Sequence, residues 1–261
     1  MKILNGAEIA GYMKANQVRR VRSLRARGVQ PKLVILRDND NPVIAKYVTL
    51  KQKYGEDVGV EVEDWLRDDL SVAIAEANQA SDVHGMIVQL PVKVIGVDEV
   101  LAKIAPEKDV DGLNVKGEVF ESATATAINW LLAGYDIDLS KKKIAIVGHG
   151  RLVGAPLERM WQQSGYIVKS FTKGDDLAEL VNFEVIVSAT GMPHLIKTAM
   201  VQPGAIVVDA GTASEDGVLV GDVDEAVRER EDLSAITPKI GGVGPLTVTA
   251  LFEHVLMAAN K

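Results

Sequence analysis

The sequence lacks cysteine, long apolar runs and an apolar N-terminal stretch. Without cysteine the chain can form no disulfide scaffold, no thiolate metal site and no cysteine nucleophile. Its apolar runs are short, as at residues 144–147 and 205–208, whereas a membrane-spanning helix needs about 18 residues. Residues 1–6 lack the apolar character of a signal peptide. We therefore expect a cytoplasmic protein with no membrane segment.

Positively charged residues are fewer than negatively charged ones. Lys and Arg number 29 against 36 Asp and Glu, and the net charge is −7. Nucleic-acid binding through clustered cations is therefore not expected, and the one basic stretch, residues 19–27, is expected to be a solvated helix face. No pair among the four histidines has metal-ligand spacing, so no metal site is predicted. These histidines are His84, His149, His194 and His254.

The apolar residues that are present form short segments of two alternating kinds. We expect helices over residues 7–27, 42–58, 71–79, 98–104, 124–133 and 245–258. We expect strands over residues 32–36, 60–65, 85–89, 143–147, 167–171, 184–189 and 205–209. Strands that alternate with helices predict an α/β fold with parallel sheets and right-handed crossovers.

A glycine-rich turn, G-H-G-R-L-V-G at residues 148–154, joins an expected strand to an expected helix. Glycine lets the backbone approach a pyrophosphate, and the N-terminus of a helix offers free N–H groups to it. The placement predicts a dinucleotide site. The spacing is one residue longer than the usual fingerprint, so a tight strand–helix turn without a ligand is the alternative.

The end of the next strand bears on the choice of dinucleotide. NAD sites usually place an acid there, which binds the ribose hydroxyls. This strand instead carries Lys169 and Ser170, which together with Arg151 could bind a 2′-phosphate. NADP is therefore favoured over NAD. Asp175 and Asp176 follow closely and weaken this preference, and a solvated strand end is the alternative.

The strand–helix alternation restarts near residues 113–123, which divides the chain into two α/β domains. We expect an N-terminal α/β substrate domain over residues 1–117, completed by a C-terminal helix over 246–261. A Rossmann-like dinucleotide-binding domain is expected over 118–245, with the active cleft between the two domains.

Tyr47 and Lys51 lie four residues apart and so share a face of an expected helix. A tyrosine ring offers a platform for stacking, and burial can convert a lysine into a base near neutral pH. A row of surface lysines is the plainer interpretation of the same spacing. Gln89 and Pro91 follow an expected strand, where parallel sheets place ligands. Residues 109–112 form an acidic segment that would equally suit a capped turn.

Five segments together resemble one known family. They are Y-V-T-L-K-Q-K at residues 47–53, V-Q-L-P at 88–91, P-E-K-D-V-D-G at 106–112, G-D-V-D at 221–224 and T-P-K-I-G-G-V-G-P-L-T at 237–247. In this order they resemble FolD, the family of bifunctional methylenetetrahydrofolate dehydrogenase/methenyltetrahydrofolate cyclohydrolases. The resemblance covers nearly the whole chain. It implies a homodimer that pairs through the Rossmann-like domain and acts on tetrahydrofolate derivatives, polyglutamylated forms included.

The resemblance implies two reactions. A dehydrogenase step transfers a hydride from 5,10-methylenetetrahydrofolate to NADP, with NAD as the alternative, and leaves the 5,10-methenyl cation. A cyclohydrolase step adds water and opens the ring to give 10-formyltetrahydrofolate. By this resemblance Lys51 is the catalytic lysine and Gln89 tunes its position and charge. Tyr47 stacks on the aminobenzoyl ring, and Asp111 accepts hydrogen bonds from the pterin.

The same resemblance implies larger sets of binding residues. The substrate-binding residues are Tyr47, Lys51, Gln89, Leu90, Pro91, Asp111, Gly244 and Pro245. The cofactor-binding residues are Gly148, His149, Gly150, Arg151, Val153, Gly154, Lys169, Ser170, Thr172, Ala189, Thr190, Gly191, Gly211 and Gly242. Residues 241–245 are implied to form a loop that closes over both ligands, and Thr247 to begin the last helix.

The chain departs from the family pattern at two places that bear on function. The family's P-C-T-P-x-G aligns with S-A-T-A-T-A, so that its cysteine is Ala123 here. The family turn G-R-S-x-x-V-G loses its Arg and Ser to His149 and Gly150. A member with cyclohydrolase activity alone, or with NAD-dependent dehydrogenase activity alone, is therefore an alternative. So are a non-catalytic binding protein, which would not need Lys51, and a shikimate-type dehydrogenase, which would not explain residues 108–112.

Overall fold

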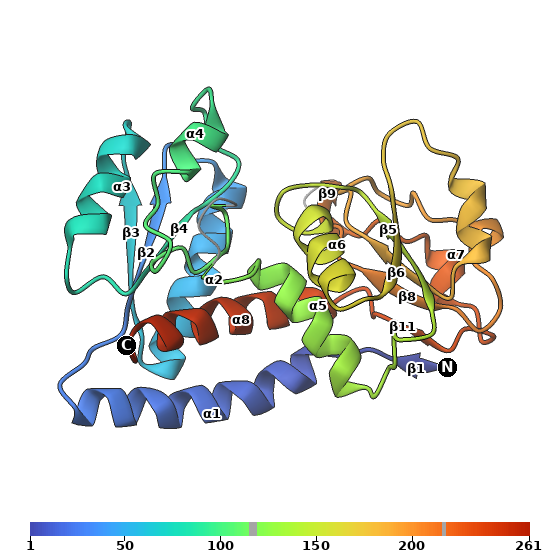
Figure 1. The fold of residues 1–261 in the computed structure, drawn as a ribbon, viewed down its shortest axis with the longest axis horizontal. Coiled ribbons are helices and arrows are strands. Elements are labelled where there is room, and N and C mark those ends of the chain that lie inside the picture. Colours follow the sequence, from blue (N-terminus) through green and yellow to red (C-terminus); the bar gives the residue numbers. More distant parts are fainter. Residues whose placement is uncertain (115–118, 216–217) are drawn as a thin grey trace. The chain divides into compact units, whose positions relative to one another are not determined.

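The computed structural model describes residues 1–114, 119–215 and 218–261, and it contains two compact units. The three-strand unit consists of Gly11–Ala123 and Val248–Lys261. The six-strand unit consists of Met1–Ala10 and Thr124–Thr247. Figure 1 traces the chain through both units, and two long helices, α1 (Gly6–Ala26) and α8 (Val243–Ala258), contribute residues to each.

The three-strand unit is built on a parallel sheet with the strand order β3-β2-β4. Its strands are β2 (Lys32–Arg37), β3 (Glu61–Leu66) and β4 (Gly85–Val88), and its helices are α2 (Pro42–Val58), α3 (Leu70–Gln79) and α4 (Val97–Leu101). Because side chains alternate along a strand, one face of the sheet presents Val34, Leu36 and Met86 to α3. In Figure 1 the three strands lie between α3 and α2.

The six-strand unit is built on a parallel sheet with the strand order β1-β11-β8-β7-β5-β6. Its strands are β1 (Lys2–Ile3), β5 (Lys143–Val147), β6 (Ile167–Phe171), β7 (Val185–Ser188), β8 (Ile206–Asp209) and β11 (Ala235–Ile236); β9 (Ala213–Glu215) and β10 (Val218–Val220) pair separately as an antiparallel ribbon. Its helices are α5 (Ala123–Gly134), α6 (Gly154–Gln163) and α7 (Glu225–Arg228), with 3₁₀ turns η1 (Leu177–Asn182) and η2 (Thr198–Met200).

The strand order of the six-strand sheet reverses at β5. The chain passes from β5 to β6 on one side of β5 and then to β7 on its other side. Such a reversal of strand order marks where doubly wound sheets bind ligands.

The bounds of α2 show how the sequence sets its local structure. Asn41 caps the helix by accepting the backbone N–H of Val43 at 2.8 Å, and Pro42 takes the first turn, where no N–H is needed. Gly59 ends the helix with φ of +87°, a left-handed conformation that glycine adopts without strain. Both ends agree with the predicted helix over residues 42–58.

The compact units and the predicted domains divide the start of the chain differently. β1 pairs in parallel with β11, so residues 1–10 belong to the six-strand unit, whereas the prediction places them in the N-terminal domain over 1–117. A two-residue strand has too short a pattern to be predicted from its own residues. The predicted boundary between 117 and 118 lies outside the described residues.

The crossovers after β6 and β7 contain 3₁₀ turns in place of α-helices. Each contains only a 3₁₀ turn, η1 or η2. Gly174 interrupts the first segment, and Pro193 and Pro203 interrupt the second, and these residues disfavour a longer helix. In the described part of the chain, no helix has the length and apolar character to cross a membrane, and no cluster of three or more His, Cys, Asp or Glu could hold a metal ion.

Candidate active site

Helix α2 carries a tyrosine and a lysine on one face. Ile44 and Val48 belong to the core, whereas Tyr47 and Lys51 lie half-buried beside them. Side chains four residues apart are neighbours on a helix. The Tyr47 ring and the Lys51 amino group therefore emerge from the same side of α2.

Gln89 follows β4 and holds the Lys51 amino group. Its backbone N–H donates to the carbonyl of Leu36 at 2.8 Å, which continues the sheet by one residue. Its side-chain amide nitrogen donates to the carbonyl of Leu90 at 3.2 Å, and its Oε1 accepts from Lys51 Nζ at 2.8 Å. The neutral amide thus fixes the amino group without adding a counter-charge that would keep it protonated.

Lys51 and Asp111 influence each other's protonation. Burial lowers the pKa of Lys51 from its ordinary value, and the negative charge of Asp111 opposes that shift. Burial raises the pKa of Asp111 to about 7; the Lys51 charge lowers it, and the Asp109 charge adds to the rise. Both main shifts favour neutral groups, so this pair can gain or lose a proton near neutral pH.

The segment 108–112 supplies Asp111 and uses its other residues for structure. Lys108 Nζ donates to three carbonyls at the end of α3, at 2.7–2.9 Å. Asp109 is buried, and its carboxylate accepts the backbone N–H of Leu113 at 3.1 Å and that of the next residue at 2.5 Å. Gly112 has φ of +66°, and a Cβ there would lie 2.7 Å from backbone atoms. These contacts hold the turn, while the Asp111 carboxyl interacts electrostatically with Lys51.

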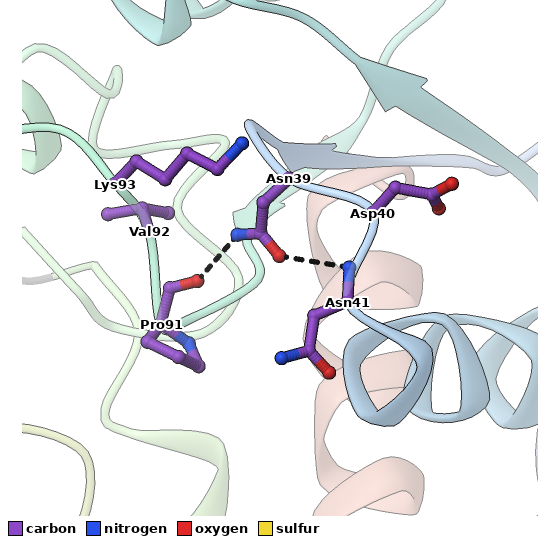
Figure 2. A pocket seen from close by; sticks show the side chains of 6 residues that line it. All are labelled: Asn39, Asp40, Asn41, Pro91, Val92 and Lys93. Carbon is purple, nitrogen blue, oxygen red and sulfur yellow. Dashed lines mark hydrogen bonds between the residues drawn. The ribbon is translucent and has the colours of Figure 1, made fainter.

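An open hollow of about 440 Å³ lies at the carboxyl ends of β2 and β4 (Figure 2). It is lined by Asn39, Asp40, Asn41, Pro91, Val92 and Lys93. Figure 2 shows the Asn39 amide between the two loops, donating to the carbonyl of Pro91 at 3.0 Å and accepting the N–H of Asn41 at 3.2 Å. Asp38 accepts the N–H of Lys93 at 2.7 Å. The loop that carries Leu90 and Pro91 is therefore tied to the loop after β2.

The glycine-rich turn lies in the six-strand unit, between β5 and α6. Gly148 has φ of +95°, and a Cβ there would lie 2.7 Å from the carbonyl oxygen of Ala189. A Cβ on Gly154 would lie 1.8 Å from the carbonyl oxygen of Gly148. These two glycines allow the turn to close. A Cβ on Gly150, by contrast, would meet no heavy atom of the described chain within 4 Å, so this stretch of backbone is open to a ligand.

Several residues predicted to bind the cofactor contact carboxylates or are buried. His149 Nε2 lies 2.7 Å from Glu158 Oε2. Lys169 forms an ion pair with Glu179. Ser170 Oγ is buried within β6 and has no hydrogen-bond partner in the described chain. Arg151 and Val153 lie in the turn itself, before α6. The predicted 2′-phosphate contacts of Arg151, Lys169 and Ser170 therefore remain a prediction.

Asp222, a residue whose role was not predicted, organises the end of β7. Its side chain is fully buried, and its Oδ2 accepts from Ser188 Oγ at 2.7 Å, Thr190 N at 2.7 Å and Thr190 Oγ1 at 2.9 Å. A Cβ on Gly211 would lie 1.9 Å from Asp222 Oδ1. Asp222 thus positions Thr190 and requires glycine at 211, and both are predicted cofactor contacts. The motif G-D-V-D at residues 221–224 is visible in the sequence. The sequence alone does not show which strand ends are connected by hydrogen bonds to its first aspartate.

Asp209 plays a similar part at the end of β8. Its carboxylate accepts the backbone N–H groups of Asp222 and Val223 at 3.1 Å, and the Arg228 guanidinium donates to it at 2.5 Å. Burial is the main cause that raises the pKa of Asp209. A Cβ on Gly221 would lie 2.0 Å from its Oδ2. Hydrogen bonds therefore connect the segment 221–224 to the ends of β7 and β8.

Residues 241–245 do not form a continuous loop, contrary to the prediction. α8 begins at Val243, so Gly244 and Pro245 belong to its first turn and Thr247 lies within it. Proline suits a first turn because its missing N–H would have no partner there. Only Gly241, with φ of +87°, and Gly242 precede the helix.

Two family models together match most of the chain. Residues 4–111 match the model of the tetrahydrofolate dehydrogenase/cyclohydrolase catalytic domain, and residues 122–261 match that of its NAD(P)-binding domain. The bifunctional protein FolD of Macrococcus caseolyticus is 36% identical over 279 residues, which cover 100% of this chain and 98% of that protein.

Solved structures agree in fold over the whole length. The bifunctional FolD dehydrogenase/cyclohydrolase of Campylobacter jejuni is 33% identical with a TM-score of 0.92, covering 100% of this chain and 99% of that one. The FolD of Trypanosoma brucei, solved with NADP and an inhibitor, is 26% identical with a TM-score of 0.89, covering 99% and 97%. This chain belongs to the tetrahydrofolate dehydrogenase/cyclohydrolase family.

Proposed function

We propose that this protein oxidises 5,10-methylenetetrahydrofolate to the 5,10-methenyl form with NADP, and hydrolyses that form to 10-formyltetrahydrofolate. Membership of the family and the full-length likeness to bifunctional relatives support both activities. The observation that carries the proposal is the Lys51 amino group, held 2.8 Å from Gln89 and electrostatically linked to Asp111. A protein that only bound folate would have no need for a lysine with a lowered pKa.

In the hydrolysis, we assign Lys51 the role of general base. Water attacks the cationic methenyl carbon, and its proton passes to Lys51 Nζ, whose lowered pKa makes the neutral amine accessible. The resulting carbinolamine collapses as its hydroxyl proton passes to solvent, N5 takes the proton held by Lys51 Nζ and the C–N5 bond breaks, which leaves the formyl group on N10. Gln89 keeps the amine in place, and Asp111 holds the pterin through hydrogen bonds. Tyr47 lies on the same helix face and provides the ring on which the aminobenzoyl group stacks.

The six-strand unit fits a dinucleotide. Its glycine turn leaves the Gly150 backbone open at the N-terminus of α6, where a pyrophosphate finds N–H groups and a positive dipole. Thr190, held by Asp222, and Gly211 lie at the ends of β7 and β8, the edge at which such sheets bind cofactors. When bound, the nicotinamide accepts the hydride. NADP is proposed because the Trypanosoma brucei relative was solved with it.

Three further expectations belong to this proposal. The protein is expected in the cytoplasm, as a homodimer, with polyglutamylated folates among its substrates. Family membership argues against the shikimate-type alternative, and the bifunctional relatives give no support to a single-activity enzyme.

Replacing Lys51 separates the two reactions. A Lys51→Met variant should lose methenyl hydrolysis by at least about 100-fold, the usual contribution of a general base, and should still bind NADP. Lys51→Arg should lose as much, because a guanidinium cannot give up its proton in a protein. Methenyl absorbance decay measures hydrolysis, and calorimetric titration measures NADP binding.

The matched control is Lys46→Met on the same helix, which removes an exposed lysine and should leave both readings unchanged. Undiminished hydrolysis in Lys51→Met would remove the lysine from its assigned role. Retained hydrolysis in Lys51→Arg alone would show that the lysine acts by charge rather than as a base.

A further inference from the structure

Thr172 lies where a Rossmann-type sheet meets the ribose of its cofactor. β5 and β6 end level with each other, since Val147 pairs with Phe171 and the N–H of Gly148 donates to the Phe171 carbonyl at 2.8 Å. Thr172 is the next residue, directly beside the glycine turn. At this strand end a side chain contacts the 2′-hydroxyl of NAD or the 2′-phosphate of NADP.

The two donors of Thr172 converge on one carboxylate oxygen. Its backbone N–H donates to Asp175 Oδ2 at 2.6 Å, and its hydroxyl donates to the same oxygen at 3.0 Å. An N–H and a hydroxyl that converge in this way form a site for an anionic oxygen. These two hydrogen bonds also lower the pKa of Asp175, so the carboxylate is ionised at neutral pH.

From this geometry we propose that Asp175 limits the preference of this protein for NADP over NAD, because its carboxylate occupies the donors that a 2′-phosphate would use. This inference rests on the proposed dehydrogenase function. A ribose 2′-hydroxyl can donate to the carboxylate, whereas a 2′-phosphate meets two occupied donors and a charge of its own sign. The one cation of β6, Lys169, forms an ion pair with Glu179, and its charge is the smallest of the causes that act on the pKa of Asp175.

The test is calorimetric titration of the full-length protein and its variants with NADP and with NAD. Asp175→Asn removes the charge and leaves a neutral amide oxygen, a weaker acceptor that a 2′-phosphate can displace from the Thr172 donors, so it should tighten NADP binding on the order of tenfold. NAD binding should change by less than about twofold, which is under 0.5 kcal/mol. Adding Thr172→Val to Asp175→Asn should reverse the gain for NADP, because the hydroxyl that the 2′-phosphate would take over from the amide oxygen is then absent.

The matched control is Asp176→Asn, which removes the same charge one residue further along. Asp176 caps η1 by accepting the N–H of Ala178 at 2.9 Å, and it makes no hydrogen bond to Thr172 in the described structure. The ratio of NAD to NADP dissociation constants of the Asp176→Asn variant should therefore match that of the wild type. An unchanged ratio in Asp175→Asn, or an equal change in Asp176→Asn, would overturn the inference alone. Failure of every variant to bind either dinucleotide would overturn the proposed dehydrogenase function as well.

Discussion

Two aspartates separated by one residue have different tasks in the segment 108–112. The Asp109 carboxylate is buried and accepts backbone N–H groups, which compensate for its burial. Asp111 is half-buried and interacts electrostatically with Lys51, and its burial raises its pKa to about 7. The residue type is the same, and only the local hydrogen bonds decide that one aspartate supports the turn while the other is available for chemistry.

An Asp111→Asn variant should gain thermal stability relative to the wild type as the pH rises. The raised pKa means that the native state binds more protons than the unfolded state between about pH 4 and pH 7. The contribution of this bound proton to the free energy of unfolding is fully present below about pH 4 and is lost as the pH rises to about 7. An asparagine has no such dependence. By calorimetry, the Tm difference between variant and wild type should be at least about 2 °C larger at about pH 8 than at about pH 5.

Asp68→Asn is the control for that measurement, because Asp68 is exposed and its replacement removes one carboxylate of the same unit. Its Tm difference from the wild type should be equal at both pH values. A pH-independent Tm difference for Asp111→Asn would show that the Asp111 carboxyl is not protonated in the native state near neutral pH.

At the scale of single elements, α1 begins against the segment that precedes α8. Asn5 Oδ1 caps α1 by accepting the N–H of Ala7 at 3.1 Å, and the same N–H donates to the carbonyl of Gly241 at 3.0 Å. A Cβ on Gly6 would lie 2.0 Å from the carbonyl oxygen of Gly242. Glycine at position 6 is therefore required by close approach of two backbones rather than by its own conformation.

Two glycine-to-alanine changes in α1 should have opposite effects. Gly6→Ala should destabilise the protein by about 1–3 kcal/mol, because its methyl group has no room beside Gly242. Gly11→Ala should stabilise it by about 0.5–1 kcal/mol, because a Cβ there meets no heavy atom of the described chain within 4 Å and alanine favours a helix. Urea unfolding measures both changes. Equal effects of the two variants would show that the contact between residues 6 and 242 is absent in solution.

At the scale of the whole molecule, each compact unit carries one part of the chemistry. The three-strand unit holds Lys51, Gln89 and Asp111, and the six-strand unit holds the glycine turn and the strand ends beside it. In the proposed function, the dehydrogenase reaction requires both ligands at once, whereas the hydrolysis assigned to Lys51 uses residues of the three-strand unit. The proposal therefore requires the six-strand unit for the dehydrogenase reaction alone.

Hydrogen–deuterium exchange should map the two ligands to different units. NADP should slow exchange in residues 148–154 and 189–191, because their backbone contacts the bound dinucleotide. Tetrahydrofolate should slow exchange in residues 89–91 and 109–112. Each ligand serves as the control for the other, and protection of residues 89–91 by NADP with no change at 148–154 would contradict the assignment.

Local pattern alone determined most of the regular structure. The predicted bounds of β5 and β6 agree with the structure residue for residue, and those of α2 do as well. These elements are specified by β-branched apolar runs, a capping residue and terminal glycines, all of which act within a few residues of the chain. The sequence also showed two α/β halves, and the motifs that it carries were sufficient for the family.

Long-range packing decided the rest. β1 is too short to show a strand pattern in its own sequence, and it forms because it pairs in parallel with β11. The roles of Asp222 and Asp175 depend on which donors reach their carboxylates, Thr190 in one case and Thr172 in the other. A carboxylate in the sequence can cap a turn, clamp two strands or repel a phosphate. Which of these it does depends on its neighbours in space, and only the tertiary structure provides them.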